Sequence, residues 1–125
     1  MSVSRNSLEG LVTLIIDRGE SASHLRDAFS RAGALVFVVQ DSATRRYLPR
    51  NFIPHIAVID PETIEERELR ALAYGLVSDL NCHSIIYSSM VPEQSRGLDD
   101  LVHKSATPSV VVDVAVSALD KRCRR

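Results

Sequence analysis

The chain has 125 residues, which favours one domain with a core of its own. Its net charge of −1, with both signs interspersed, gives no electrostatic footprint for nucleic acid, and no apolar run reaches the roughly 20 residues of a membrane-spanning helix. Two widely spaced cysteines suggest neither a disulfide framework nor a cysteine zinc site, so we expect a cytoplasmic protein. We expect residues 1–9 to form a tail and residues 10–125 a single domain.

The first half of the chain alternates apolar runs with helical periods. Residues 11–16 (LVTLII) are short, β-branched and followed by turn chemistry, which predicts a buried strand. A helix follows, with Ser21 or Ser23 as its expected cap and Gly33 as its expected end. Residues 34–40 (ALVFVVQ) predict a second strand.

The middle of the chain repeats this order more clearly. HIAVID, residues 55–60, predicts a third strand, and residues 65–80 predict an amphipathic helix. The helix carries one apolar stripe, made of Leu69, Leu72, Ala73, Leu76, Val77 and Leu80.

The last third is less regular. Residues 84–89 (SIIYSS) predict a fourth strand and LVHK, residues 101–104, a short fifth one, with room for at most about two helical turns between them. The valine-rich segment 109–123 has strand-forming residues, but its helical spacing and its length favour a helix.

Strands without polar alternation, separated by helices, predict an α/β fold with a doubly wound parallel sheet and helices on both faces. In such sheets ligands bind outside the carboxyl ends of the strands. The polar residues at that edge are therefore the candidate functional residues.

Four strands deliver polar groups to this edge: Asp17, Asp60, Ser88 with Ser89, and Lys104. Two carboxylates could share Mg²⁺, while a hydroxyl and an ammonium could hold phosphoryl oxygens. A carboxylate can also act as the nucleophile and become an aspartyl phosphate. Each residue has a simpler interpretation too, as a turn residue, a cap or a solvated lysine.

With these residues the chain resembles the receiver domain of response regulators in two-component signalling, over about residues 10–121. The resemblance implies a five-stranded parallel sheet of the receiver or flavodoxin-like type with five helices. It implies Asp60 as the phosphoacceptor, Ser89 and Lys104 as the phosphate-sensing residues, and Mg²⁺ held by Asp17 and Asp60.

Four departures from the family pattern concern the metal and the output face. Arg18 stands where the family has a second acid; it could pair with Asp60 in place of the metal, or point to solvent. The segment before Lys104 is short by roughly two turns, so the family's fourth helix should be stunted or unwound. Leu101 replaces an aromatic switch residue, and Ser105 replaces a proline.

The leading hypothesis is an atypical, stand-alone receiver in a phosphorelay that accepts phosphate on Asp60 and signals through protein contacts. Its expected partners are a histidine kinase or phosphotransfer protein and a downstream target, with neither nucleic acid nor membrane contacted directly. The alternative is a pseudo-receiver, an interaction module that is not phosphorylated and in which Arg18 replaces the metal.

A small enzyme or nucleotide-binding domain is the third class considered. No glycine-rich phosphate loop follows the first strand, the histidines lack metal-ligand spacing, and Ser88-Ser89 lacks a nucleophile elbow. We therefore expect no enzymatic activity. A homodimer through Val110, Val114 or Ala118 is a further hypothesis; in the alternative, these residues complete the core.

Overall fold

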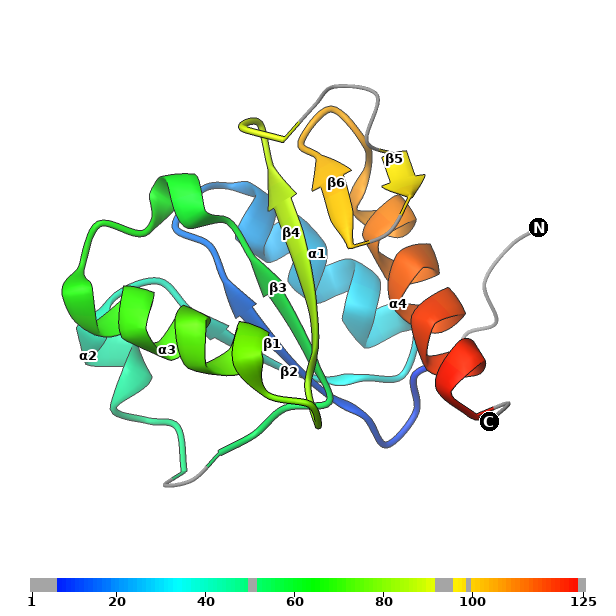
Figure 1. Cartoon of the computed structure of the whole chain (residues 1–125), viewed down its shortest axis with the longest axis horizontal. Helices are drawn as coiled ribbons and strands as arrows, with labels where there is room; N and C mark the ends of the chain where they lie inside the picture. Colours follow the sequence, from blue (N-terminus) through cyan, green and yellow to red (C-terminus); the bar gives the residue numbers. More distant parts are fainter. Residues whose placement is uncertain (1–6, 50–51, 92–95, 99, 124–125) are drawn as a thin grey trace.

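The chain folds around one twisted sheet with helices on both of its faces (Figure 1). The computed structural model describes residues 7–49, 52–91, 96–98 and 100–123. Five strands run parallel and a short sixth strand is antiparallel at the edge; in spatial order they are β2 (Leu35–Val39), β1 (Val12–Ile16), β3 (Ile56–Ile59), β4 (His83–Ser88), β6 (Leu101–His103) and β5 (Arg96–Leu98). The predicted doubly wound α/β class is confirmed.

The helices divide between the two faces of the sheet. They are α1 (Ser21–Arg31), α2 (Ser42–Arg45), a 3₁₀ turn η1 (Pro61–Thr63), α3 (Arg67–Ser78) and α4 (Pro108–Cys123). Helices α1 and α4 lie on one face and α2 and α3 on the other, as Figure 1 shows. No helix in the described part of the chain is long and apolar enough to cross a membrane.

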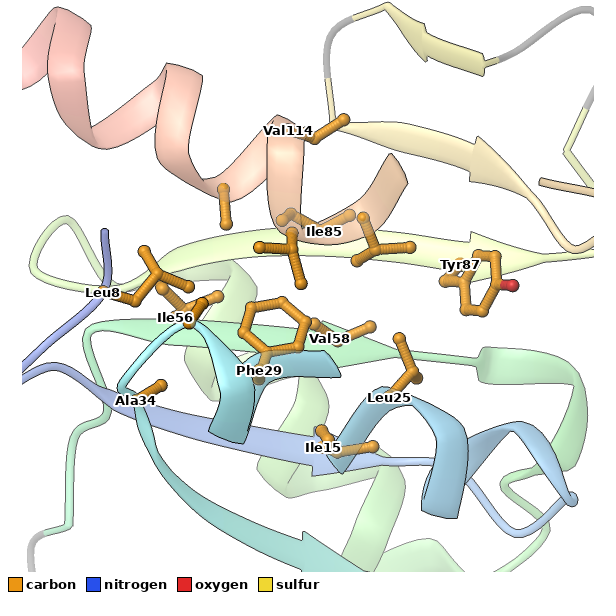
Figure 2. Packing of buried hydrophobic residues seen from close by; sticks show 14 of the residues in the cluster. Leu8, Ile15, Leu25, Phe29, Ala34, Ile56, Val58, Ile85, Tyr87 and Val114 are labelled. Carbon is orange, nitrogen blue, oxygen red and sulfur yellow. The ribbon is translucent and has the colours of Figure 1, made fainter. Parts of the chain in front are cut away.

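Alternate residues of each strand supply two separate cores, because successive side chains of a strand point to opposite faces. On the α1/α4 face, Phe29 and Leu25 of α1 pack over Val58 and Ile85 (Figure 2). The opposite core lies between the sheet and α3 and is made of Leu14, Ile16, Val39, Ala57, Ile59, Ile64, Leu69, Leu76 and Cys82. This pattern explains why the strands read as unbroken apolar runs in the sequence.

The two ends of helix α1 test the predicted cap and the predicted stop. The N-cap residue is Glu20, whose side chain makes no capping hydrogen bond, so the prediction of a Ser21 or Ser23 cap is wrong. The prediction for Gly33 is right. It has a φ of 95°, and a Cβ there would lie 3.1 Å from the Cα atom of Glu9, so the turn needs glycine both for its left-handed backbone and for space.

The folded unit extends further toward the N-terminus than the predicted boundary at residue 10. Leu8 is fully buried in the α1/α4 core, and its backbone N–H donates to the Ala32 carbonyl at 2.8 Å. The structure therefore ties the segment before β1 to the end of α1.

The connection from β4 to β6 differs most from a regular α/β unit. A stunted or unwound helix was predicted there, and the described part of this connection contains the strand β5, with no helix. The chain thus turns back along the sheet edge, and β5 pairs with β6 in antiparallel orientation. Residues 92–95 and 99 of the predicted segment lie outside the described residues.

The C-terminal helix α4 and the helix α3 were both predicted from their apolar spacing. The C-terminal segment is helical, as its spacing indicated, and Val114 is buried while Val110 and Ala118 are partly buried. In α3, Leu69 and Leu76 are buried, but Val77 is 55% exposed, and Leu80, which follows the end of the helix at Ser78, is 90% exposed. The predicted stripe is therefore wrong at its C-terminal end, where these two side chains are exposed.

Candidate strand-end site

Asp17 and Asp60 reach the same edge because β1 and β3 are parallel neighbours in register. Ile16 pairs with Ile59, so the two aspartates follow the paired strands at the same level, and the Asp60 N–H donates to the Ile16 carbonyl at 3.0 Å. Both side chains are almost completely buried, with 1% and 3% exposure. Buried carboxylates require hydrogen bonds or a cation, so their partners define the site.

Lys104 is the cation that joins them. It follows β6, and its Nζ atom lies 2.6 Å from Asp17 Oδ2 and 3.0 Å from Asp60 Oδ2. It also donates to the hydroxyl of Ser21 at the start of α1. Asp17, Asp60 and Lys104, here called the carboxylate–lysine triad, therefore connect three strands at the edge predicted to carry function.

The remaining carboxylate oxygens are bound by backbone amides of the adjoining turns. Gly19 N–H donates to Asp17 Oδ1 at 2.7 Å, and Glu62 N–H donates to Asp60 Oδ1 at 3.0 Å. The Ser21 hydroxyl adds a bond to Asp17 Oδ2 at 3.0 Å. All four carboxylate oxygens consequently have a donor within the chain.

The charge of Lys104 is stabilised by these neighbours. Burial alone lowers the pKa of Lys104, but hydrogen bonds to Asp17 and Asp60 and the charges of both carboxylates outweigh it, so the pKa is raised. The ammonium also lies 5.1 Å from the centre of the Tyr87 ring, a cation–π distance. Burial raises the pKa of Tyr87, which the Lys104 charge opposes and the Asp17 charge supports.

Arg18 does not join the triad. Its side chain is exposed, and no ion pair connects it to Asp60 among the residues that the structure describes. Its backbone N–H donates to the Thr63 hydroxyl at 3.1 Å. The pKa of Asp41 is lowered, mainly by hydrogen bonds from Thr44 and in small part by the charge of Arg18. Of the two predicted alternatives for Arg18, the structure therefore has the solvent-directed one.

Ser89 lies at the site but does not touch the triad. It is exposed, and its hydroxyl donates to the Glu62 carboxylate. Its neighbour Ser88 is buried at the end of β4, where its Oγ accepts from the Met90 N–H at 3.1 Å. In the described part of the chain, Glu62 links Ser89 to Asp60, because its carboxylate accepts from Ser89 and its N–H donates to the aspartate.

Three polar residues of this site escaped the sequence analysis: Ser21, Glu62 and Thr63. Ser21 was treated as a helix cap, although it lies only four residues after Asp17 and its hydroxyl donates to that carboxylate. A pattern in the sequence could have indicated Glu62 and Thr63. An aspartate before proline predicts a cap with Pro at the first helical position, and Asp60 indeed caps η1.

Comparisons with known proteins support the architecture. No family model matches the chain, and no curated protein matches it. Among solved structures, the chain is similar to the receiver domain of the Francisella response regulator 1452, with a TM-score of 0.62, 18% identity, and coverage of 88% of this chain and 99% of that one. The chain has a receiver-like fold.

A second solved structure has the same degree of similarity. It is a fusion that carries a trimeric coiled coil of yeast Spc42, with a TM-score of 0.64, 18% identity, and coverage of 94% of this chain and 86% of that one. At this level of identity, both similarities establish the fold and nothing beyond it.

Proposed function

We propose that this chain is a receiver-like signalling module that acts through protein contacts and whose strand-end site is held by Lys104 without a metal ion. The fold supports the signalling class, since a response-regulator receiver domain is among its structural neighbours. The observation that carries the proposal is the position of the Lys104 ammonium, within hydrogen-bonding distance of both Asp17 and Asp60. A partner would then recognise one constitutive conformation.

The charges at the site argue against the Mg²⁺ that the receiver resemblance implies. Mg²⁺ needs carboxylate oxygens that can leave their hydrogen bonds, and each oxygen of Asp17 and Asp60 already accepts a bond within the chain. Two carboxylates face the ammonium of Lys104, with the cation Arg18 next in sequence to Asp17. No group of three metal-ligating side chains occurs among the described residues. We infer that these residues do not fit the ion as they are arranged.

The second candidate is the phosphoacceptor function of Asp60, supplied by a histidine kinase or phosphotransfer protein. Its support is the contact between Lys104 Nζ and Asp60 Oδ2, because an ammonium in that place would also bind an oxygen of a phosphoryl group on Asp60. In this chemistry an Asp60 oxygen attacks phosphorus, an acyl phosphate forms, and the donor's leaving group departs with its electron pair.

Intact-mass analysis after incubation with phosphoramidate, with and without Mg²⁺, separates the two candidates. The proposal expects no adduct on the unchanged chain and no Mg²⁺-dependent rise in its melting temperature. An adduct that disappears in Asp60→Asn would overturn the proposal and establish the second candidate.

A charge-reversal variant makes a negative result informative. Arg18→Asp restores a second acid beside Asp17, and it should gain a melting-temperature shift with Mg²⁺ and labelling at Asp60. The matched controls are Arg18→Ala, which removes the cation without adding an acid, and Arg26→Asp, which changes an exposed arginine on α1. If the controls gain as much as Arg18→Asp, the missing acid is not what keeps the metal out.

A further inference from the structure

The face of the sheet that carries α2 and α3 is incompletely covered. Helix α3 packs over β1, β3 and the start of β4, while the β4–β6 connection adds an edge strand and no helix in the described residues (Figure 1). Ile86 and Leu101 are paired neighbours on β4 and β6. Ile86 is partly buried against α3 and Leu101 is 40% exposed, so apolar surface of both strands stays open on this face.

A groove of about 320 Å³ lies along this open surface. Val77, in the last turn of α3, and Leu80, just after the helix, line it together with Ile86 and Leu101 from the strands. Leu80 is 90% exposed, which is unusual for a large apolar side chain beside other apolar ones. We call these four residues the α3–β6 groove.

Two acidic side chains line the groove among the described residues. They are Asp79 and Asp100, and Asp100 Oδ1 lies 2.7 Å from Nε2 of His83, which also lines it. The groove also lies at the C-terminal end of α3, where the helix dipole adds partial negative charge and the last turn has no basic residue. An occupant that complements the groove therefore carries apolar side chains flanked by lysine or arginine.

We propose that the α3–β6 groove binds an amphipathic helix of a partner protein whose apolar stripe is flanked by basic residues. Such a helix would lie over β6 and the end of β4, which no helix of the described residues covers on this face, with its apolar side chains on Leu80, Ile86 and Leu101 and its cations near Asp79 and Asp100. This inference rests on the proposed function only in that the module acts through protein contacts; it needs neither phosphorylation nor a metal.

A second copy of the chain is a poorer occupant. Two copies related by a two-fold axis would place the same patch against itself, which brings both acidic rims together. Like charges facing each other in an interface are unfavourable, so the acidic rim argues for a partner of opposite charge.

The direct test is titration with a fluorescently labelled Leu/Lys amphipathic peptide of about four helical turns. The chain has no tryptophan, so the label is on the peptide. We expect saturable binding, with NMR shift changes centred on Val77, Ile86 and Leu101. A Leu/Glu peptide of the same pattern should bind roughly tenfold more weakly or not at all. Absence of saturable binding, or equal binding of both peptides, would overturn the proposal.

Variants locate the binding. The double substitution Leu80→Ser with Leu101→Ser should lower the affinity for the Leu/Lys peptide by roughly tenfold, because the apolar contacts are lost. Tyr74→Ser is the matched control, since Tyr74 is 77% exposed on α3 and does not line the groove. All of these side chains are exposed, so the fold should survive, which far-UV circular dichroism checks. If Tyr74→Ser weakens binding as much as the groove pair, the site is not the groove.

Sedimentation equilibrium addresses the second copy. We expect a monomer. If the chain is instead a dimer, and the double substitution Leu80→Ser with Leu101→Ser dissociates it, then a second copy of the chain occupies the groove and the proposal of a partner helix is overturned. The phosphodonor experiment at Asp60 can fail or succeed without changing either result, since the groove contains none of the triad residues.

Discussion

The two faces of the sheet are built from the same strands but are covered to different extents. On the α1/α4 face, two helices cover the sheet and bury Ile85, Tyr87 and Val102. On the other face α3 covers only part of it, and Leu101, which precedes Val102 in the same strand, is 40% exposed. In an α/β sheet a crossover helix covers the strands that it connects, and the described part of the β4–β6 connection contains no helix, so apolar surface stays exposed there.

The largest predicted effect contrasts two adjacent residues of β4. Ile85→Ala should lower the free energy of unfolding by roughly 2–5 kcal/mol, since Ile85 is fully buried under α4. Ile86→Ala on the partly covered face should cost only about 1 kcal/mol. Urea unfolding of both variants measures the difference. Equal losses would mean that the α3 face is covered in solution, against the open groove described above.

Loss of the cation at the strand ends should have the next largest effect. Lys104→Met keeps the aliphatic stem but leaves Asp17 and Asp60 without their shared ammonium, which should cost roughly 2–3 kcal/mol. Arg26→Met is the control, as its exposed ion pair with Asp27 should change stability by less than about 0.5 kcal/mol. If Lys104→Met is as stable as this control, the carboxylate–lysine triad does not contribute to the stability of the fold.

Alkaline unfolding gives a pH signature of the same site. The pKa of Lys104 is raised in the folded chain, so its stabilising contribution is complete below the ordinary value of 10.5 and is lost as pH rises through the higher folded value. Tyr87 acts in the same direction, because its pKa is also raised and the unfolded tyrosine ionises first.

Stability measured from about pH 9 upward should therefore stay level at first and fall above about pH 10, the ordinary pKa of tyrosine, and further above the ordinary lysine value of 10.5. The loss should be smaller in Lys104→Met and, separately, in Tyr87→Phe. If the free energy of unfolding falls with pH as steeply in Lys104→Met as in the unchanged chain, the raised pKa of the Lys104 ammonium is contradicted.

The smallest expected changes in stability come from replacing two glycines, one that the fold needs and one that it does not. Gly33→Ala should destabilise by roughly 1–2 kcal/mol, because alanine disfavours the positive φ and its Cβ meets Glu9. Gly75→Ala in exposed α3 should stabilise by about 0.5–1 kcal/mol, since no atom lies within 4 Å of the added Cβ. Thermal unfolding measures both, and the two substitutions should shift the melting temperature in opposite directions.

Local pattern predicted the elements well and their ends poorly. Apolar runs located the parallel strands, and helical spacing located α1, α3 and the C-terminal helix. The expected Ser21 cap was wrong because the helix already begins at Ser21, and its hydroxyl binds Asp17 and Lys104, of which Lys104 is 83 residues away in sequence. The apolar stripe of α3 failed at Val77 and Leu80 because nothing in the helix itself reports whether a neighbour covers it.

Local apolar patterns were enough to predict the alternation of strands and helices, and with it the sheet edge where Asp17, Asp60 and Lys104 follow their strands. Parallel pairing then brings those ends together for any such alternation, which is why the triad was predictable. Only the tertiary structure decided that Lys104 joins both carboxylates while Arg18 faces solvent, that Ser89 binds Glu62, and that β5 leaves the sheet open. These are choices among partners far apart in sequence, and no local periodicity records them.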